Sequence, residues 1–259
     1  MNIVVCVKQV PDTWAERKLK PGDATLDRES VDGLINELDE YAIEEALQLK
    51  EAHEGEVTVL TMGPEKASES IRKALSMGAD KAVHLTDDAL AGSDVLQTSY
   101  ALAQVLKQIG FDLVVLGAES TDARMGSMAA MLAERLGVPQ LSLASKVEVD
   151  GSAIKVHRQS EDGYWTVEGT LPAVISVVEK INEPRYPSFK GIMAAKKKPM
   201  QVMSCADAGI DTSLVGVANA ATEVVDFAER PPRQAGSIVK DEGDGGGKVA
   251  EFLVTSKFI

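Results

Sequence analysis

One polar loop in the sequence carries groups that are suited to binding a phosphate. It spans residues 117–127, reads G-A-E-S-T-D-A-R-M-G-S, and directly follows an apolar run. Its hydroxyls, its glycines and the free amides of the helix expected after it could hold an anion. In an open parallel sheet, ligands bind beyond the carboxyl ends of the strands, where the strand order reverses. Loops 8–12 and 61–64 are expected at the same edge. A nucleotide site and an ordinary polar loop with a helix cap are both open explanations of these residues.

A second stretch, residues 182–198, is suited to contact with another protein. It reads N-E-P-R-Y-P-S-F-K-G-I-M-A-A-K-K-K, and its prolines are expected to stop regular structure at its start. Between Arg185 and Lys198 there are five basic residues and no acidic residue, in a chain whose net charge is −13. A basic island in an acidic protein is a candidate contact surface for an acidic partner, and apolar residues beside lysines suit an interface. The alternative is a solvated basic loop whose few apolar residues are buried in the core.

The motifs of self-contained catalysts are missing from the sequence. No G-x-G-x-x-G follows a strand-like run, and the three histidines lack metal-ligand spacing. The glycines before Lys248 do not form a phosphate loop, because Glu242 stands where the first glycine is needed and Val249 replaces the Ser or Thr. No Ser-His-Asp or Cys-His pairing is indicated. We therefore expect no catalytic residues, no metal and no substrate turnover by this chain alone.

Composition limits the class of protein. A chain of 259 residues with 44% hydrophobic residues can form one large domain or two small ones. The acidic balance argues against nucleic acid as a partner, and no apolar run is long enough for membrane insertion. The opening M-N-I-V-V-C-V-K is interpreted as a first strand rather than a signal peptide. Two lone cysteines indicate a reducing compartment, so we expect a cytoplasmic protein.

Alternating strand and helix signals predict an α/β fold with a mostly parallel, doubly wound sheet. Apolar runs predict buried strands at 3–7, 57–60, 82–85 and 112–116. Four helices are expected between and after them. The first spans 36–52 with Asn36 as N-cap, the second opens at Gly63-Pro64, the third is capped by Ser93, and the fourth contains Met128. After Pro139, short alternating segments at 145–150, 154–158 and 164–167 predict added antiparallel strands, and 173–178 predicts a further buried strand. From about Cys205 the sequence predicts little ordered core, apart from a short helix at 248–258.

Several motifs resemble the electron transfer flavoprotein beta subunit family. N-E-P-R-Y followed by I-M-x-A-K-K-K resembles the family's recognition loop, and G-x-x-S-T-D followed by a helix ending L-G-V-P-Q resembles its adenosine monophosphate loop. Residues 156–176 resemble the family's hairpin, although Gln159 and Trp165 depart from its usual residues. The tail motif P-P-R-Q-A-G at 231–236 also matches. The similarity covers most of the chain.

The resemblance implies bound nucleotides and the residues that hold them. It implies adenosine monophosphate (AMP) in this chain and flavin adenine dinucleotide (FAD) held mainly by a larger alpha subunit. Residues 37–39 and 123–124 differ from the pattern of the animal members. The implied cofactor contacts are Cys6, Asn36, Glu37, Leu38, Asp39, Met62, Gly117, Ala118, Glu119, Ser120, Thr121, Asp122, Ala123, Arg124, Met125, Gly126, Ser127 and Met128.

The resemblance also implies partners. Members pair with an alpha subunit, dock onto acyl-CoA dehydrogenases through one hydrophobic anchor, and carry electrons towards the respiratory chain. Phe189 occupies the anchor position, where Leu is common. Residues 1–204 would form the nucleotide-binding domain and 205–259 an arm packing on the partner subunit. The alternatives are an electron-bifurcating member with a second FAD, and a nucleotide-binding stress or signalling protein of the same fold. The implied recognition residues are Tyr186, Phe189, Ile192, Met193, Lys196, Lys197 and Lys198.

Overall fold

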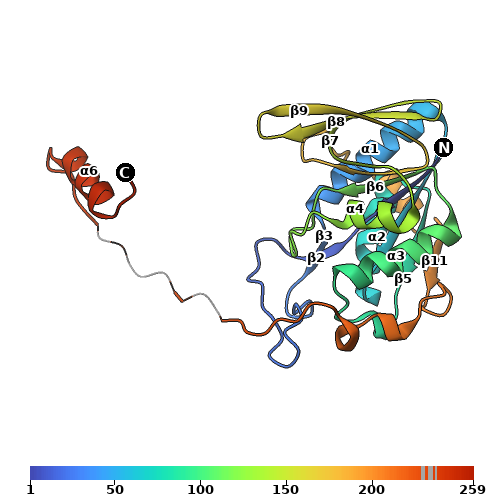
Figure 1. The fold of residues 1–259 in the computed structure, drawn as a ribbon, viewed down its shortest axis with the longest axis horizontal. Coiled ribbons are helices and arrows are strands. Elements are labelled where there is room, and N and C mark those ends of the chain that lie inside the picture. The colour runs from blue at the N-terminus through green and yellow to red at the C-terminus, as the bar shows by residue number, and fades with distance from the viewer. Residues whose placement is uncertain (229–230, 233–235, 237) are drawn as a thin grey trace. The chain divides into compact units, whose positions relative to one another are not determined.

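Nine strands form one sheet among residues 1–228, 231–232, 236 and 238–259, which are the residues that the computed structural model describes (Figure 1). In spatial order the strands are β11 (Met200–Met203), β5 (Lys81–Leu85), β4 (Glu56–Met62), β1 (Asn2–Cys6), β6 (Leu113–Gly117), β10 (Ala173–Val177), β7 (Gln140–Asp150), β8 (Ala153–Ser160) and β9 (Gly163–Thr170). Strands β11 to β7 pair in parallel, whereas β8 and β9 are antiparallel additions at one edge. The predicted fold class, including the antiparallel extension, is confirmed.

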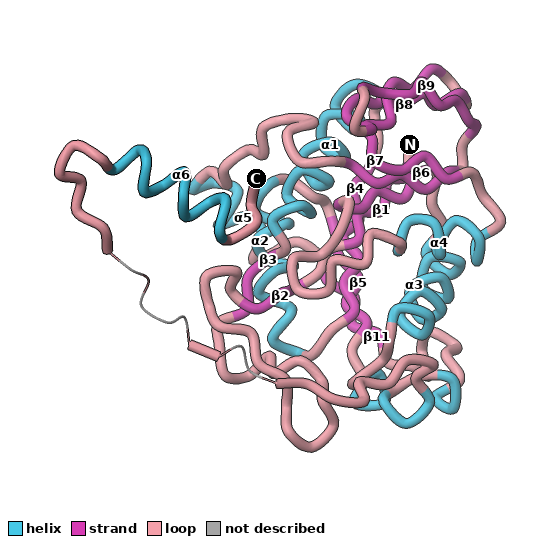
Figure 2. Tube along the Cα trace, turned by 60° about the vertical axis from the view of Figure 1, so that its left-hand side comes forward, coloured by secondary structure: helices cyan, strands magenta, loops and turns pink. Residues whose placement is uncertain are grey.

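Helices cover both faces of the parallel strands. Helices α1 (Glu37–His53) and α2 (Ser68–Met77) lie on one side, and α3 (Val95–Ile109) and α4 (Met128–Leu136) lie on the other (Figure 2). The period of two along β1 sends Ile3 and Val5 into the first core and Val4 into the second. Central strands such as β1, β6 and β10 are therefore buried on both faces, which explains their apolar sequences.

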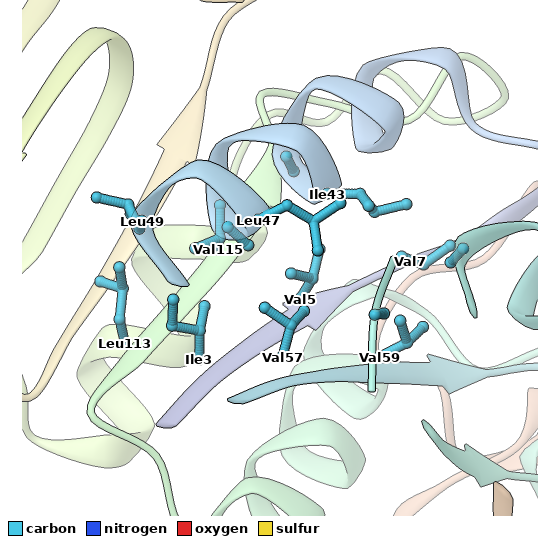
Figure 3. Packing of buried hydrophobic residues seen from close by; sticks show 14 of the residues in the cluster. Ile3, Val5, Val7, Ile43, Leu47, Leu49, Val57, Val59, Leu113 and Val115 are labelled. Atoms are coloured by element: carbon cyan, nitrogen blue, oxygen red, sulfur yellow. The ribbon is translucent and has the colours of Figure 1, made fainter. Parts of the chain in front are cut away.

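The core on the α1 side is built from interdigitating aliphatic side chains. Ile43 and Leu47 of α1 pack over strand residues such as Val5 and Val57 (Figure 3). These side chains are at most 2% exposed, and each contributes about 1.5–3 kcal/mol through burial. The core fixes α1 against the sheet and thereby places the amino end of α1 beside the ends of β1 and β6.

Some local predictions are wrong. Helix α3 is capped by Asp94, which forms a reciprocal capping box with Gln97, whereas the Ser93 hydroxyl accepts a hydrogen bond from the Gly216 amide. Strand β11 and the two-stranded ribbon of β2 (Gln9–Pro11) and β3 (Gly33–Ile35) were not predicted from the sequence. These strands have only three or four residues, too few to show a period.

The first compact unit extends beyond the expected boundary at residue 204. It comprises Met1–Glu223, and the second unit comprises Val224–Ile259. Cys205, Ala208, Ile210 and Val215 are buried in the core on the α3 side, so the prediction of little order from residue 205 is wrong for this segment. The tail motif P-P-R-Q-A-G lies partly outside the described residues.

The second unit contains the predicted C-terminal helix. Helix α6 spans Gly245–Thr255, so the three glycines directly before Lys248 belong to its first turn. Phe252 lies 6.3 Å from Phe258, measured between ring centroids, and both are largely exposed. No helix in the described part of the chain is both long and apolar enough to cross a membrane.

Candidate functional sites

The strand order reverses between β1 and β6, and the predicted loops meet there. From β1 the chain continues outward through β4 and β5 on one side, while β6 and β10 lie on the other. The loops that follow β1, β4 and β6 therefore emerge at the same edge of the sheet, together with the amino end of α1. A crevice outside the carboxyl ends at such a reversal is where open α/β sheets bind ligands.

Gly117 permits the close approach of α1 to the end of β6. A Cβ atom at this position would lie 2.6 Å from Asp39 Oδ1 and 2.8 Å from the carbonyl carbon of Leu38. Both distances are shorter than any van der Waals contact, so a larger residue would separate helix and strand. The glycine thus brings the first turn of α1 against the polar loop after β6.

Asn36 ties this loop to α1. Its side chain is fully buried; Nδ2 donates to the Glu119 carbonyl and to Asp39 Oδ1, and Oδ1 accepts from the Thr121 amide, each at 3.0 Å. Asn36 occupies the predicted N-cap position, but its side chain makes no capping bond to its own helix. It satisfies backbone groups of the loop instead, so its role is to hold residues 119–121 in place.

Asp39 is a buried carboxyl at the same point. Its Oδ2 accepts a hydrogen bond from the Lys8 amide at 2.8 Å. Burial raises its pKa from 3.8 to about 7, although hydrogen bonds from Lys8, Asn36 and Gly117 and the Lys8 charge act in the opposite direction. The neighbouring Cys6 is also buried, and burial together with Asp39 raises the pKa of its thiol to about 12. Cys6 therefore stays protonated at neutral pH and is a packing residue rather than a nucleophile.

Asp122 holds two cations beside the loop. Its side chain is 1% exposed, with Lys8 Nζ at 2.7 Å from Oδ1 and Arg28 Nη2 at 2.9 Å from Oδ2. Burial opposes ionisation of this carboxyl, but the two cations outweigh that effect and lower its pKa. Two positive charges against one negative charge leave the cluster cationic. Arg28 could not be predicted from the sequence, because it lies in the long segment between β2 and β3 and no local pattern connects it with Asp122.

The middle of the loop is an exposed turn with free hydroxyls near it. Arg124 and Gly126 adopt left-handed backbone angles, with φ values of 51° and 61°. Residues 123–126 are exposed, while Thr121 is buried. The buried side-chain oxygens of Thr61, Thr121 and Ser127 have no hydrogen-bond partner among the described residues. Buried hydroxyls normally have partners, so an oxygen without one calls for a partner such as a bound molecule or a water.

The other predicted contacts are placed around this centre. Ala118, Glu119 and Ser120 are partly buried at the start of the loop, and Met128 begins α4. Glu37 accepts a hydrogen bond from the Thr13 hydroxyl at 3.0 Å, and Met62 packs partly against the core on the α3 side. The structure therefore gathers the predicted residues at one edge, with Glu37 and Met62 at its border.

The basic stretch forms a helix rather than an irregular loop. Helix α5 (Phe189–Ala195) begins at Ser188, whose hydroxyl accepts a hydrogen bond from the Gly191 amide. Phe189 is 81% exposed and Tyr186 is 94% exposed, and Ile192 and Met193 are about half exposed. The alternative in which these apolar side chains are buried in the core is wrong.

Of the three consecutive lysines, two face solvent and one does not. Lys196 and Lys197 are exposed. Lys198 Nζ instead donates to the carbonyl oxygens of Leu75 and Ala79, at 2.9 and 2.6 Å. Lys198 was predicted as a recognition residue, but in the structure its ammonium group is directed at the end of α2.

Comparison with known proteins decides the family. Residues 23–208 match the electron transfer flavoprotein domain. The chain is 55% identical over its whole length to the electron transfer flavoprotein subunit beta of Mycobacterium bovis, covering 99% of that protein. It is 37% identical to the subunit of the same name from Megasphaera elsdenii, with each chain fully covered. The chain belongs to the electron transfer flavoprotein beta subunit family. The stress-protein alternative is thereby set aside.

A beta subunit of an electron transfer flavoprotein implies an alpha subunit and a flavin in the complex. A third relative, at 37% identity and covering 92% of each chain, is named caffeyl-CoA reductase–Etf complex subunit CarD, from Acetobacterium woodii. Within the described residues, no group of three or more His, Cys, Asp or Glu side chains could hold a metal ion.

Asp39 predicts a specific pH dependence of stability. Its pKa is raised in the folded chain, so between about pH 4 and pH 7 the folded state keeps a proton that the unfolded chain has released. Stability from this group is complete below pH 4 and is lost as the pH rises to 7, by up to about 1.4 kcal/mol per pH unit. We expect Asp39→Asn to remove this slope in urea unfolding at pH 5, 6, 7 and 8.

The variant also loses an acceptor, which costs stability equally at every pH. The test is therefore the slope of the difference between wild type and variant, not its size at one pH. Parallel curves for the two proteins would show that Asp39 ionises normally in the folded chain.

Proposed function

We propose that the chain is the beta subunit of a heterodimeric carrier that accepts electrons from acyl-CoA and related dehydrogenases and passes them towards the respiratory chain. The observation that supports this most is the exposed face of α5. An aromatic side chain that is 81% exposed stands beside two half-exposed apolar side chains and three exposed lysines, Lys190, Lys196 and Lys197. In the cytoplasm, where we place the protein, such a face would be covered only when a partner docks.

The chemistry of α5 suits repeated, brief contact. Lysines attract an acidic partner over several ångströms and raise the association rate, and a single apolar anchor limits the lifetime of the complex. A carrier needs both properties, because it must leave each dehydrogenase after electron transfer. The partner surface that fits α5 is an apolar pocket with an acidic rim.

We further propose that the carboxyl ends of β1 and β6 border a nucleotide crevice, and that this crevice binds AMP. The cationic cluster of Lys8, Arg28 and Asp122 favours an anion, and the unpartnered hydroxyls of Thr121 and Ser127 can donate to phosphate or ribose oxygens. The turn at Arg124 and Gly126 lies exposed in the same loop. These residues fit a nucleotide phosphate.

FAD, held mainly by the alpha subunit, would supply the one- and two-electron chemistry of the complex. This chain's contribution is to bind the alpha subunit, to fill the crevice with AMP and to present α5. Residues 224–259 are proposed to pack on the alpha subunit, since Val249, Phe252, Val254 and Phe258 are more than half exposed in the chain alone.

A second candidate is an electron-bifurcating complex, in which the same crevice holds a second FAD. Its support is the 37% identity to the subunit of the caffeyl-CoA reductase–Etf complex. Both candidates use the crevice, so the identity of the nucleotide separates them.

The experiment is to count nucleotides. The chain is co-expressed with its alpha subunit, the purified complex is denatured, and released FAD and AMP are separated and quantified per heterodimer. One FAD and one AMP are expected for the simple carrier. Two FAD and no AMP would replace it with the bifurcating candidate, and a complex without flavin would contradict both.

A further inference from the structure

We propose that Arg185, Gly191 and Lys198 fix α5 rigidly against α1 and α2, so that the docking face is formed before a partner arrives. The inference rests on the proposed function only in assigning docking to α5. Arg185 and Lys198 would then be positioning residues rather than contacts to the partner, although both belong to the basic stretch.

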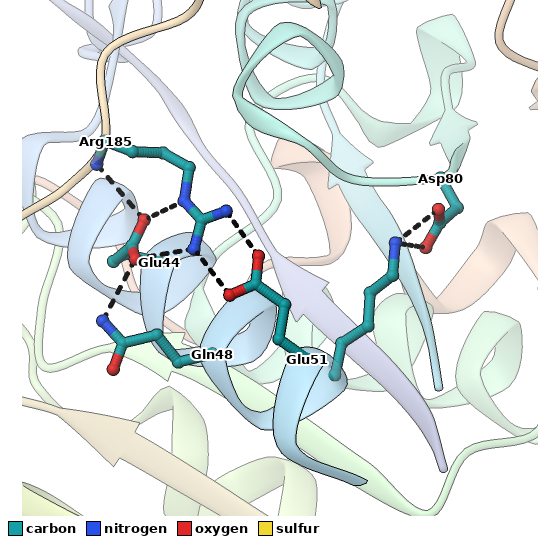
Figure 4. Close-up of polar contacts among 6 residues, drawn as sticks. Glu44, Gln48, Glu51, Asp80 and Arg185 are labelled. Atoms are coloured by element: carbon teal, nitrogen blue, oxygen red, sulfur yellow. Dashed lines mark hydrogen bonds and ion pairs between the residues drawn. The ribbon is translucent and has the colours of Figure 1, made fainter. Parts of the chain in front are cut away.

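Arg185 clamps the start of the stretch to α1. Its Nε and Nη2 lie 2.7 and 2.9 Å from the two carboxylate oxygens of Glu44, and its Nη1 lies 2.6 Å from Glu51 Oε1 (Figure 4). Its backbone amide also donates to Glu44, at 3.2 Å. Glu44 and Glu51 are two helical turns apart and so share one face of α1. Only a planar guanidinium can bond both carboxylates at once, one of them bidentately.

The clamp is largely removed from solvent on the Glu44 side. The Glu44 side chain is 6% exposed, and its second neighbour Gln48 donates to it at 3.0 Å. Burial opposes its ionisation, but the bonds from Arg185 and Gln48 outweigh this and lower its pKa. The bonds from both carboxylates raise the pKa of Arg185. Arg185 is therefore ionised throughout the physiological pH range, and its charge is paired with carboxylates of α1 rather than with a partner.

Gly191 allows α5 to lie directly on α2. A Cβ atom at Gly191 would be 2.5 Å from the backbone carbonyl oxygen of Ser76, so even alanine would push the two helices apart. One turn later, Ala195 is buried in the core on the α1 side. The inner face of α5 is thus made of small residues, while Phe189, Ile192 and Met193 face outward.

Lys198 fixes the other end of the stretch. Its ammonium group bonds the Leu75 and Ala79 carbonyls, which lie at the carboxyl end of α2 (Ser68–Met77) and just beyond it. Carbonyl groups at a helix end lack intrahelical partners and carry partial negative charge. The seven residues of α5 are therefore held on both sides, which a helix of this length needs because it is not stable alone.

The test compares Arg185→Ala and Arg185→Lys with wild type in the heterodimer. Lys107→Ala, which removes an exposed cation from α3 on the opposite face of the sheet, is the control for charge. Hydrogen exchange of the amides of 189–197 reports the fixing of α5. The concentration of acyl-CoA dehydrogenase that gives half-maximal electron transfer reports docking.

We expect Arg185→Ala to speed exchange in α5 and to raise the half-saturating concentration about tenfold, with the maximal rate and the flavin content unchanged. For Arg185→Lys, both the exchange rate and the half-saturating concentration should lie between those of wild type and Arg185→Ala, because one ammonium group reaches one carboxylate. Glu51→Gln leaves the bonds between Arg185 and the buried Glu44 intact and should have a smaller effect. It replaces Arg185→Ala as the test variant if Arg185→Ala does not fold.

Two results would overturn the inference: unchanged exchange in α5, or faster exchange with unchanged docking. The same titration with Phe189→Ala separates this failure from that of the proposed function. If Phe189→Ala also docks normally, α5 is not the docking face; if it docks poorly while the Arg185 variants dock normally, only the preorganisation is wrong.

Discussion

Replacing Phe189 with alanine is expected to raise the half-saturating concentration of acyl-CoA dehydrogenase by roughly 30- to 1000-fold. The range corresponds to about 2–4 kcal/mol, which is typical of a central aromatic anchor. The side chain is 81% exposed on α5, so its removal takes no contact of comparable size from the chain's own core. Stability, pairing with the alpha subunit and flavin content should therefore stay at wild-type levels.

Two controls sharpen this prediction. Phe189→Leu keeps an apolar anchor at this position and should therefore retain most of the affinity. Trp165→Ala removes another aromatic side chain of similar exposure, 70%, from β9 at the edge of the sheet. The measurement is stopped-flow reduction of the heterodimer by the reduced dehydrogenase. Wild-type kinetics for Phe189→Ala would remove Phe189 from the anchor role.

The sheet could be predicted because its central strands are recognisable in the sequence as short apolar runs. A parallel strand such as β1 or β6 is buried on both faces, so its residues are apolar without interruption and stand out from the helices between them. The antiparallel pairing of β7 with β8 and of β8 with β9 could be predicted from alternation and from turn glycines. Strands β2, β3 and β11 could not, because three or four residues contain no measurable period and the pairing depends on distant strands.

The candidate sites divide in the same way. The loop after β6 is visible as one contiguous string of polar residues and glycines. The ion pair between Arg28 and Asp122 joins residues 94 positions apart, and that between Arg185 and Glu44 joins residues 141 positions apart. Such pairs exist only because the fold brings the elements together. The five basic residues at 185–198 look equivalent in the sequence, yet Arg185 and Lys198 bind the chain's own helices.

Asn36 shows how a correct local rule can give an incomplete role. Asparagine before an apolar-periodic helix is a good N-cap, and Asn36 does occupy that position. In the folded chain its side chain bonds the carbonyl of Glu119 and the amide of Thr121 instead. Without Asn36 these backbone groups would lack those hydrogen bonds. The same residue therefore both begins α1 and shapes the loop after β6, which local sequence alone could not indicate.

Deleting residues 224–259 is expected to abolish stable pairing with the alpha subunit while leaving the first unit folded. Both core clusters consist of residues between Ile3 and Val215, so the deletion removes none of the buried side chains that hold the sheet and its helices together. The deleted segment instead carries exposed apolar side chains, including Phe252, Phe258 and Ile259. Several such side chains buried at an interface contribute many times the thermal energy, so their loss should lower affinity by orders of magnitude.

The measurement is co-expression of the shortened chain with the alpha subunit, followed by size-exclusion chromatography and circular dichroism. A double variant, Phe252→Ala with Phe258→Ala, is the matched control, because it keeps the chain length and removes the two neighbouring aromatic rings. If the apolar side chains carry the affinity, the double variant should weaken pairing in the same direction as the deletion. If it pairs normally while the deletion does not, the backbone of the arm carries the contact. A full-strength heterodimer from the shortened chain would instead place the whole interface on Met1–Glu223, and the exposed face of α6 would need another partner.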